Sequence, residues 1–295
     1  MPNLWWYLLV TTIPFALFVY TLRKHSPRKV WATYFFLSGL SFILDFIVLI
    51  LLNGYVYHPG GIDNNWYDSV LGSHFSQAFI IPMIGTFIAA FQLRFRWILG
   101  IILFLVGTEE LFKFLHIYEQ FWWKTFFTGS LLCLAFPIGK VWYKVLASPP
   151  FWIIGFNTFL MVNTLVNSHN FYLLQLFDHF TFTPGWYENE TRDSIAGSAL
   201  FLVGHALFMT FVIIRKWNIP WIAFGLLLNF LTNYLLIKFD LLHLKSYWPI
   251  VLFQIDFFIT IYLFRWIYLK MFYSHMGNEK GWKRILLRTK NRTLV

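Results

Sequence analysis

Two adjacent glutamates and one lysine form the densest group of ionisable residues within an apolar stretch of the chain. Glu109 and Lys113 are four positions apart and Glu110 and Lys113 are three apart, so on a helix the ammonium group can reach either carboxylate. One lysine leaves the second carboxylate without a counter-charge. Such a group can act as a general acid or base, or can take up a proton or a cation. We therefore predict Glu109, Glu110 and Lys113 as catalytic residues.

Other polar residues occur in and near the neighbouring apolar stretches. Because successive spans alternate in direction, Asp45, His74, Gln77 and His116 fall in the same half of the bilayer as the glutamates, and we predict that they bind a ligand in one outward-facing pocket. The alternative for each polar group is a structural role, in which its hydrogen bond across helices only stabilises their packing. We favour this structural role for one histidine later in the chain. That histidine is His205, and the later part of the chain offers a second polar set: His169, His205, Asn229, Asn233 and Asp256.

Membrane-spanning helices are the elements that must position these residues. Of the 295 residues, 58% are hydrophobic and only 12% are charged, whereas soluble domains have about 25% charged residues. The composition therefore predicts an all-α, polytopic transmembrane helix bundle. A span needs about 20 mostly apolar residues, and about nine segments qualify: 4–22, 30–53, 73–93, 97–117, 123–140, 151–176, 195–214, 219–241 and 249–270.

The distribution of Lys and Arg predicts the orientation of these spans. Cytoplasmic loops retain positive charge, and most of the 23 Lys and Arg residues fall inside the cell when the N-terminus is outside and the C-terminus is inside. A net charge of +10 is also typical of nucleic-acid binders, but here the charge lies in short loops between apolar runs. We predict a multi-pass protein of the cell membrane with membrane lipids as partners and no nucleic acid.

The chain also contains an internal repeat. A shift of about 125 residues places Pro59-Gly60 on Pro184-Gly185 and Asp68-Ser69 on Asp193-Ser194, although matched glycines and prolines can also simply build the same turn twice. We predict a parallel 4+4 repeat that follows a first helix. The predicted units are a first helix with a basic loop, 1–29; a first four-helix repeat, 30–148; a second, 149–272; and a basic cytoplasmic tail, 273–295.

Several motifs in residues 1–146 occur together: the run from Trp31 through Asp45, Tyr57-His58-Pro59, Pro82, Glu110, Trp122-Trp123 and Phe136-Pro137. This series resembles the module of an uncharacterised family of multi-pass membrane proteins from spore-forming Gram-positive bacteria, and the second half resembles a degenerate copy of it. The resemblance implies a location in the cell membrane and no established activity. A fainter similarity is to the small-subunit carotenoid (lycopene) cyclases, in which one helix opens with paired acids. Here that helix has His74 and Gln77 instead.

Three classes of function fit these observations. We favour a membrane protein that binds a hydrophobic or amphipathic molecule, a lipid or an isoprenoid, with an enzymatic version in which a glutamic acid acts as the general acid or base. The alternatives are a proton- or ion-coupled transporter and a structural or assembly factor of the cell envelope. The sequence has no Gly-rich phosphate loop, zinc spacing, His-Glu-x-x-His or Gly-x-Ser-x-Gly motif, so we predict no metal and no cofactor. We expect the many Phe, Trp and Tyr side chains to contact lipid and the membrane interface.

Overall fold

The computed structural model describes residues 3–172, 176, 179–215, 217–246 and 248–276. Within these residues the fold is all-α apart from four three-residue strands, as the composition predicts. Of the predicted basic tail, 273–295, residues 277–295 lie outside the described residues. In the part that the structure describes, seven helices are long and apolar enough to cross a membrane: Leu4–Lys24, Pro27–Leu51, Asn65–Ala90, Thr125–Val145, Glu190–Arg215, Ile219–Lys238 and Trp248–Phe272.

The chain divides at the turn after residue 145 into two halves. The first half contains α1 (Leu4–Lys24), α2 (Pro27–Asp45), the π-helical η1 (Phe46–Leu51), β1 (Tyr55–Tyr57), α3 (Asn65–His74), the π-helical η2 (Phe75–Ile80), α4 (Ile81–Ala90), α5 (Phe95–Phe114), β2 (Tyr118–Gln120) and α6 (Thr125–Val145). The second half contains α7 (Phe151–Asn170), β3 (Phe180–Phe182), α8 (Glu190–Arg215), α9 (Ile219–Lys238), β4 (Leu242–Leu244) and α10 (Trp248–Met276).

Two predicted spans, 97–117 and 151–176, correspond to helices that are not among the seven apolar ones. They are α5 and α7, each of 20 residues, and both are more polar because α5 contains Glu109, Glu110 and Lys113 and α7 contains several asparagines. One predicted boundary is wrong. The span predicted to start at 73 begins at Asn65, because the side chain of Asn64 caps this helix by accepting the N–H groups of Trp66 and Tyr67.

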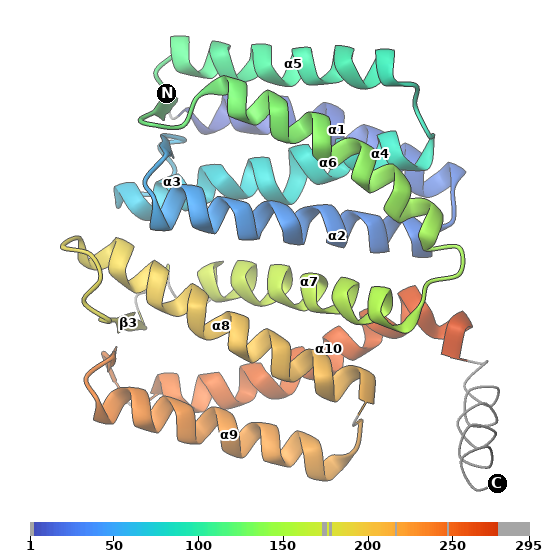
Figure 1. The fold of residues 1–295 in the computed structure, drawn as a ribbon. Helices are drawn as coiled ribbons and strands as arrows, with labels where there is room; N and C mark the ends of the chain where they lie inside the picture. Colours follow the sequence, from blue (N-terminus) through green and yellow to red (C-terminus); the bar gives the residue numbers. More distant parts are fainter. Residues whose placement is uncertain (1–2, 173–175, 177–178, 216, 247, 277–295) are drawn as a thin grey trace, which may run out of the picture.

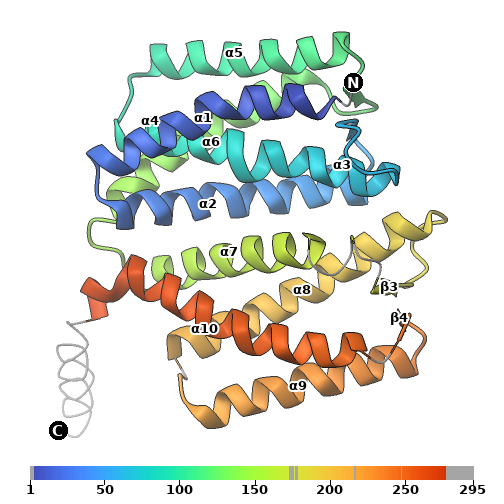
Figure 2. The same cartoon turned by 180° about the vertical axis from the view of Figure 1, so that it is seen from behind.

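The helices lie side by side along one common direction, with α1–α6 in one half of the bundle and α7–α10 in the other (Figure 1). α2 and α7 meet at the boundary between the halves, as the view from behind also shows (Figure 2). Each half has one antiparallel pair of short strands, β1 with β2 and β3 with β4, and helices separate the two strands of each pair in the sequence. The first pair lies at the end of the bundle where α1 begins, since the backbone N–H of His58 bonds to Ile117 and the amide of Asn3 bonds to His58. Figure 2 shows β3 and β4 at the same end. We call this end the strand end.

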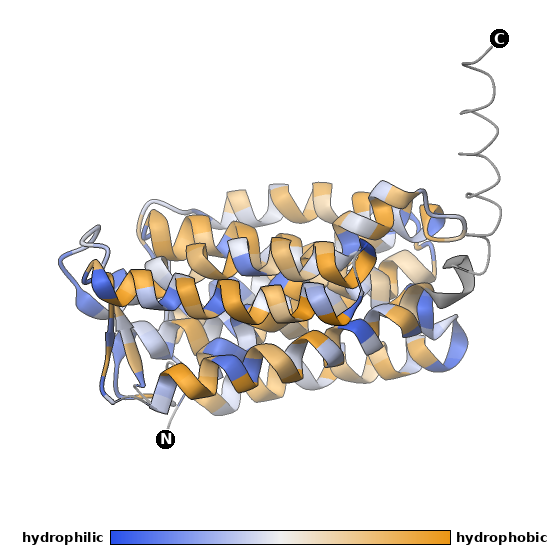
Figure 3. Cartoon of the chain, turned by 90° about the horizontal axis from the view of Figure 1, so that it is seen from below, coloured by the Kyte–Doolittle hydropathy of each residue, from blue (hydrophilic) through white to orange (hydrophobic). Residues whose placement is uncertain are grey.

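Polar residues gather at the two ends of the bundle and apolar residues occupy the middle of the helices (Figure 3). The end opposite the strand end is basic. Lys29 lies over the ring of Tyr143, Lys140 donates to the carbonyl of Leu93, and Arg215 lies over the ring of Phe151. The sides of the bundle expose large apolar side chains, such as Phe126 at 76% exposure and Leu103 at 62%. An apolar belt between two polar ends is the surface that a bilayer requires.

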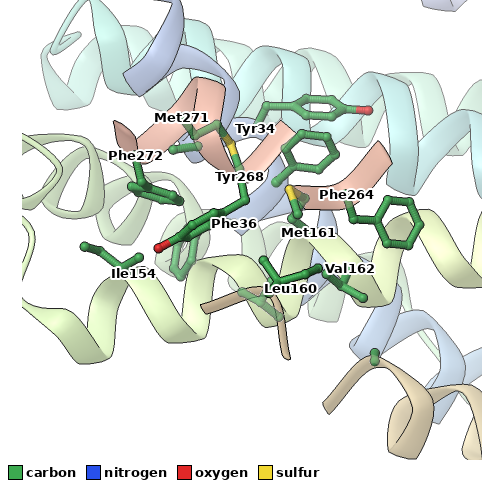
Figure 4. Close-up of a cluster of buried hydrophobic side chains, with 14 of the residues drawn as sticks. Tyr34, Phe36, Ile154, Leu160, Met161, Val162, Phe264, Tyr268, Met271 and Phe272 are labelled. Carbon is green, nitrogen blue, oxygen red and sulfur yellow. The ribbon is translucent and has the colours of Figure 1, made fainter. Parts of the chain in front are cut away.

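The core between the two halves is built from α2, α7 and α10. Phe36 on α2 stacks on Trp142 with the ring centroids 3.9 Å apart, and Leu160, Met161 and Phe264 are buried beside them (Figure 4). α2 and α7 approach closely because Gly39 faces Leu160, where an added Cβ would lie 2.6 Å from the Cβ of Leu160. The two halves therefore share one packed boundary.

Candidate functional site

A cavity of about 170 Å³ lies inside the first half and reaches from strands β1 and β2 into the bundle. We call it the Glu109 pocket. Its polar wall includes Glu109 and Gln77, and its apolar wall comes from α4, α5 and α6, with Leu105, Leu131 and Leu132. Its aromatic wall consists of Tyr7, Tyr55, Tyr57, Phe112, Tyr118 and Trp123. One cavity thus combines a carboxylate with extensive apolar and aromatic surface.

Glu109 is half-buried and points into this pocket from α5. The Nε2 of Gln120 donates to its Oε1 at 2.5 Å, and the hydroxyl of Thr128 donates to the same oxygen at 3.2 Å. Gln120 comes from β2 and Thr128 from α6, so this strand and the next helix together hold the carboxylate. Both partners are donors, which is the arrangement that an acceptor carboxylate needs.

Glu110 and Lys113 lie on the outer side of α5 rather than in the pocket. The Nζ of Lys113 is 3.0 Å from both carboxylate oxygens of Glu110, and the hydroxyl of Thr125 also donates to Glu110. Successive helical residues are about 100° apart, so the two glutamates face different surroundings. The structure therefore separates the predicted acidic pair and gives the lysine to Glu110. His116 is exposed, follows the end of α5 with a φ of 56°, and does not line the pocket.

Asp45 is buried behind the aromatic wall. Its carboxylate accepts hydrogen bonds from the hydroxyls of Tyr55 and Ser73, both at 2.7 Å, and from the Nε2 of Gln77 at 3.4 Å. Tyr55 and Gln77 line the Glu109 pocket, whereas Asp45 and Ser73 line a second cavity. Asp45 therefore stands in the wall between two cavities.

The second cavity, of about 130 Å³, lies between the two halves and is also lined by His74, Asn163 and Asn167. The Nδ1 of His74 lies 2.7 Å from the carbonyl oxygen of Val70, to which it must donate, so Nε2 is left as an acceptor. This buried Nε2 has no hydrogen-bond partner among the described residues. The π-helical segments η1 and η2 begin directly after Asp45 and His74, and such segments often occur at functional sites.

The predicted polar set of the second half is brought together in a third cavity of only about 40 Å³. His169, His205, Asn229, Asn233 and Asp256 all line it. The Nε2 of His169 lies 2.8 Å from the Oδ1 of Asp256, and the Nδ2 of Asn233 donates to the carbonyl of Asn229 at 2.9 Å. In contrast to Glu109, the carboxylate of this cavity has a basic side chain beside it.

The aromatic wall of the Glu109 pocket is the feature that the sequence analysis missed. Aromatic residues are so frequent in this chain that we expected most of them to contact lipid. A specific signal exists, because Tyr55 and Tyr57 alternate along a strand and Tyr118 lies on its partner strand. Burial raises the pKa of Tyr57 and of Tyr118, so both phenols stay neutral.

No metal site can be built from the described residues, since no group of three or more His, Cys, Asp and Glu side chains comes together there. The seven apolar helices and the polar ends define the chain as a multi-pass helical membrane protein. Comparisons with protein-family models, with curated proteins and with solved structures find no match for this chain.

Proposed function

We propose that the chain crosses the cell membrane nine times, with its N-terminus outside and its C-terminus inside. α5 and α7 lie alongside the seven apolar helices and have a similar length, which supports their crossing as well. The basic end of the bundle supports the orientation, because cytoplasmic loops retain Lys and Arg. In this orientation the strand end, from which the Glu109 pocket extends into the bundle, faces outward.

Residues 30–148 and 149–272 form, in this proposal, a parallel repeat. The support comes from two loops with the same hydrogen bonds. Asp68 accepts the backbone N–H groups of three residues at 2.8–3.0 Å, beginning with Gly60, and Asp193 does the same at 2.8–3.1 Å, beginning with Gly185. Both glycines have positive φ, 67° and 75°.

The function that we propose is the binding of a lipid-like or isoprenoid-like amphipathic molecule in the Glu109 pocket. The observation that carries this proposal is the combination of Glu109 and Gln77 with the apolar wall in one cavity. Pockets that enclose a whole drug-sized ligand have about 300–1,000 Å³, so a cavity of about 170 Å³ is sized for one end of a longer molecule. An enzymatic version would use Glu109 alone as the general acid or base, because Lys113 is bound to Glu110.

Native mass spectrometry of the protein in mild detergent tests this function. We expect the wild-type protein to retain an amphipathic molecule and an Ala135→Phe variant, which fills the apolar wall, to lose it. The matched control is Leu134→Phe, since Leu134 is the next residue on α6 but is 61% exposed on the lipid side. Retention by all three proteins would reject binding in this pocket, and so would retention by none together with no binding of an added amphipathic probe.

A further inference from the structure

The Glu109 pocket has a negative charge that no neighbouring group in its wall balances. Among the described residues that line it there is no Lys, Arg or His. The nearest lysine along α5, Lys113, is bound by both oxygens of Glu110. A carboxylate that is shielded from water needs a positive partner or several donors, and Glu109 has two neutral donors. A bound molecule can supply the missing positive charge.

Two tyrosines of the aromatic wall have their hydroxyl groups engaged in hydrogen bonds, which leaves their rings to face the pocket. The hydroxyl of Tyr7 donates to the carbonyl of Ile117 at 2.6 Å, and the hydroxyl of Tyr55 donates to Asp45 at 2.7 Å. Both rings are fixed in place by bonds that point out of the pocket. Aromatic faces attract cations, and quaternary ammonium groups are the ligands that clusters of aromatic side chains typically bind.

The rings pack against one another and form one continuous aromatic surface that a small cationic group can contact. The ring centroids of Tyr57 and Tyr118 are 4.9 Å apart, those of Tyr55 and Tyr118 are 5.5 Å apart, and those of Tyr55 and Trp123 are 6.0 Å apart. Behind Tyr55, the carboxylate of Asp45 adds a second negative charge next to the same wall. Two carboxylates and no basic group favour a cation over a neutral or anionic group in this pocket.

We propose that the polar end of the bound molecule is an organic cation, a primary or quaternary ammonium group, held by Glu109 and by the rings of Tyr55, Tyr57 and Tyr118. This inference rests on the proposed function and adds the charge of the ligand to it. The apolar wall then takes the first carbons of the attached chain. Both a membrane lipid with an ammonium headgroup and a hydrophobic amine from outside the cell have this chemistry.

Two probes of equal chain length separate charge from apolar binding. Decyltrimethylammonium and decanol are titrated into the full-length protein in an uncharged detergent, and the fluorescence of the tryptophans reports binding, since Trp123 lines the pocket. We expect the cation to bind the wild-type protein about tenfold more tightly than the alcohol. Glu109→Gln should remove this preference and leave decanol binding within about twofold. The control is Glu119→Gln, an exposed carboxylate on β2, which should change neither affinity.

The aromatic contribution has its own pair of variants. Tyr118→Leu should weaken cation binding severalfold without weakening decanol binding, and Tyr118→Phe, which keeps the ring, should restore it. Equal binding of both probes by the wild-type protein, or an unchanged preference in Glu109→Gln, overturns the cationic ligand but leaves the proposed function intact. Binding of neither probe overturns both. The mass of any co-purified molecule then assigns the cation, as a membrane lipid if an ammonium lipid is retained and as a free amine if only the added probe binds.

Discussion

The Glu109 pocket and the third cavity, which lies in the second half, differ in volume and in the side chains that line them. The first has about 170 Å³ and the second about 40 Å³. Under the proposed repeat, Tyr55 and Tyr57 correspond to Phe180 and Phe182, and Glu109 corresponds to Asn233. Four phenylalanines line the third cavity: Phe180, Phe182, Phe201 and Phe253.

The two cavities also differ in the charge of the side chains beside their carboxylates. Glu109 has only neutral donors, whereas Asp256 lies beside His169. The second half therefore satisfies its acidic group internally and fills its space with aromatic side chains. Under the proposed function, this difference favours ligand binding in the first half.

The largest expected effect comes from two buried aspartates, Asp68 and Asp193, which hold the loops that follow β1 and β3. Asp68→Ala and Asp193→Ala each leave three backbone N–H groups without their acceptor, so each should lower the free energy of unfolding by about 3 kcal/mol. Denaturation in detergent, followed by tryptophan fluorescence, measures this loss. Only Asp68→Ala should also weaken ligand binding, because its loop positions β1 in the wall of the Glu109 pocket.

The exposed Asp63 of the same loop provides the control, and Asp63→Ala should change stability by less than about 0.5 kcal/mol. Loss of ligand binding in Asp193→Ala with binding retained in Asp68→Ala would reverse the assignment of the two halves.

A smaller effect is expected when one tyrosine is converted to the residue of the second half. Tyr55→Phe removes one of the three donors to the buried carboxylate of Asp45, which should cost about 1–2 kcal/mol of stability. The reciprocal variant, Phe180→Tyr, buries a new hydroxyl in a cavity of about 40 Å³ and should destabilise by a similar amount. Thermal unfolding of the two variants compares them directly. A neutral Tyr55→Phe would mean that Asp45 does not depend on this donor.

Much of the fold follows from the sequence because lipid restricts what the chain can do. Long apolar runs must form helices, and the positions of Asp45, His74 and Glu109 along those runs place them toward the strand end. The start of α3 at Asn65 was missed because its first turns are polar, and an N-cap side chain rather than hydropathy sets that boundary.

The candidate site was only partly predictable, because the rotation of α5 is not encoded in local spacing. Lys113 can reach Glu109 or Glu110 equally well by sequence distance. Which glutamate pairs with Lys113 depends on Thr125, Gln120 and Thr128. These residues come from β2 and α6 and fix each carboxylate in a different environment. The sequence analysis likewise did not predict η1 and η2, which begin directly after Asp45 and His74.

The smallest expected effect distinguishes the two adjacent glutamates. Lys113→Gln removes an ion pair whose side chains are 34% and 51% exposed, and exposed pairs contribute about 0–1 kcal/mol. We therefore expect a loss of stability below about 1 kcal/mol and an affinity for decyltrimethylammonium that stays within about twofold, since solvent screens the lysine. If Lys113→Gln instead changed cation affinity as strongly as Glu109→Gln, the lysine would act on the pocket, and both glutamates would have to be treated as one site.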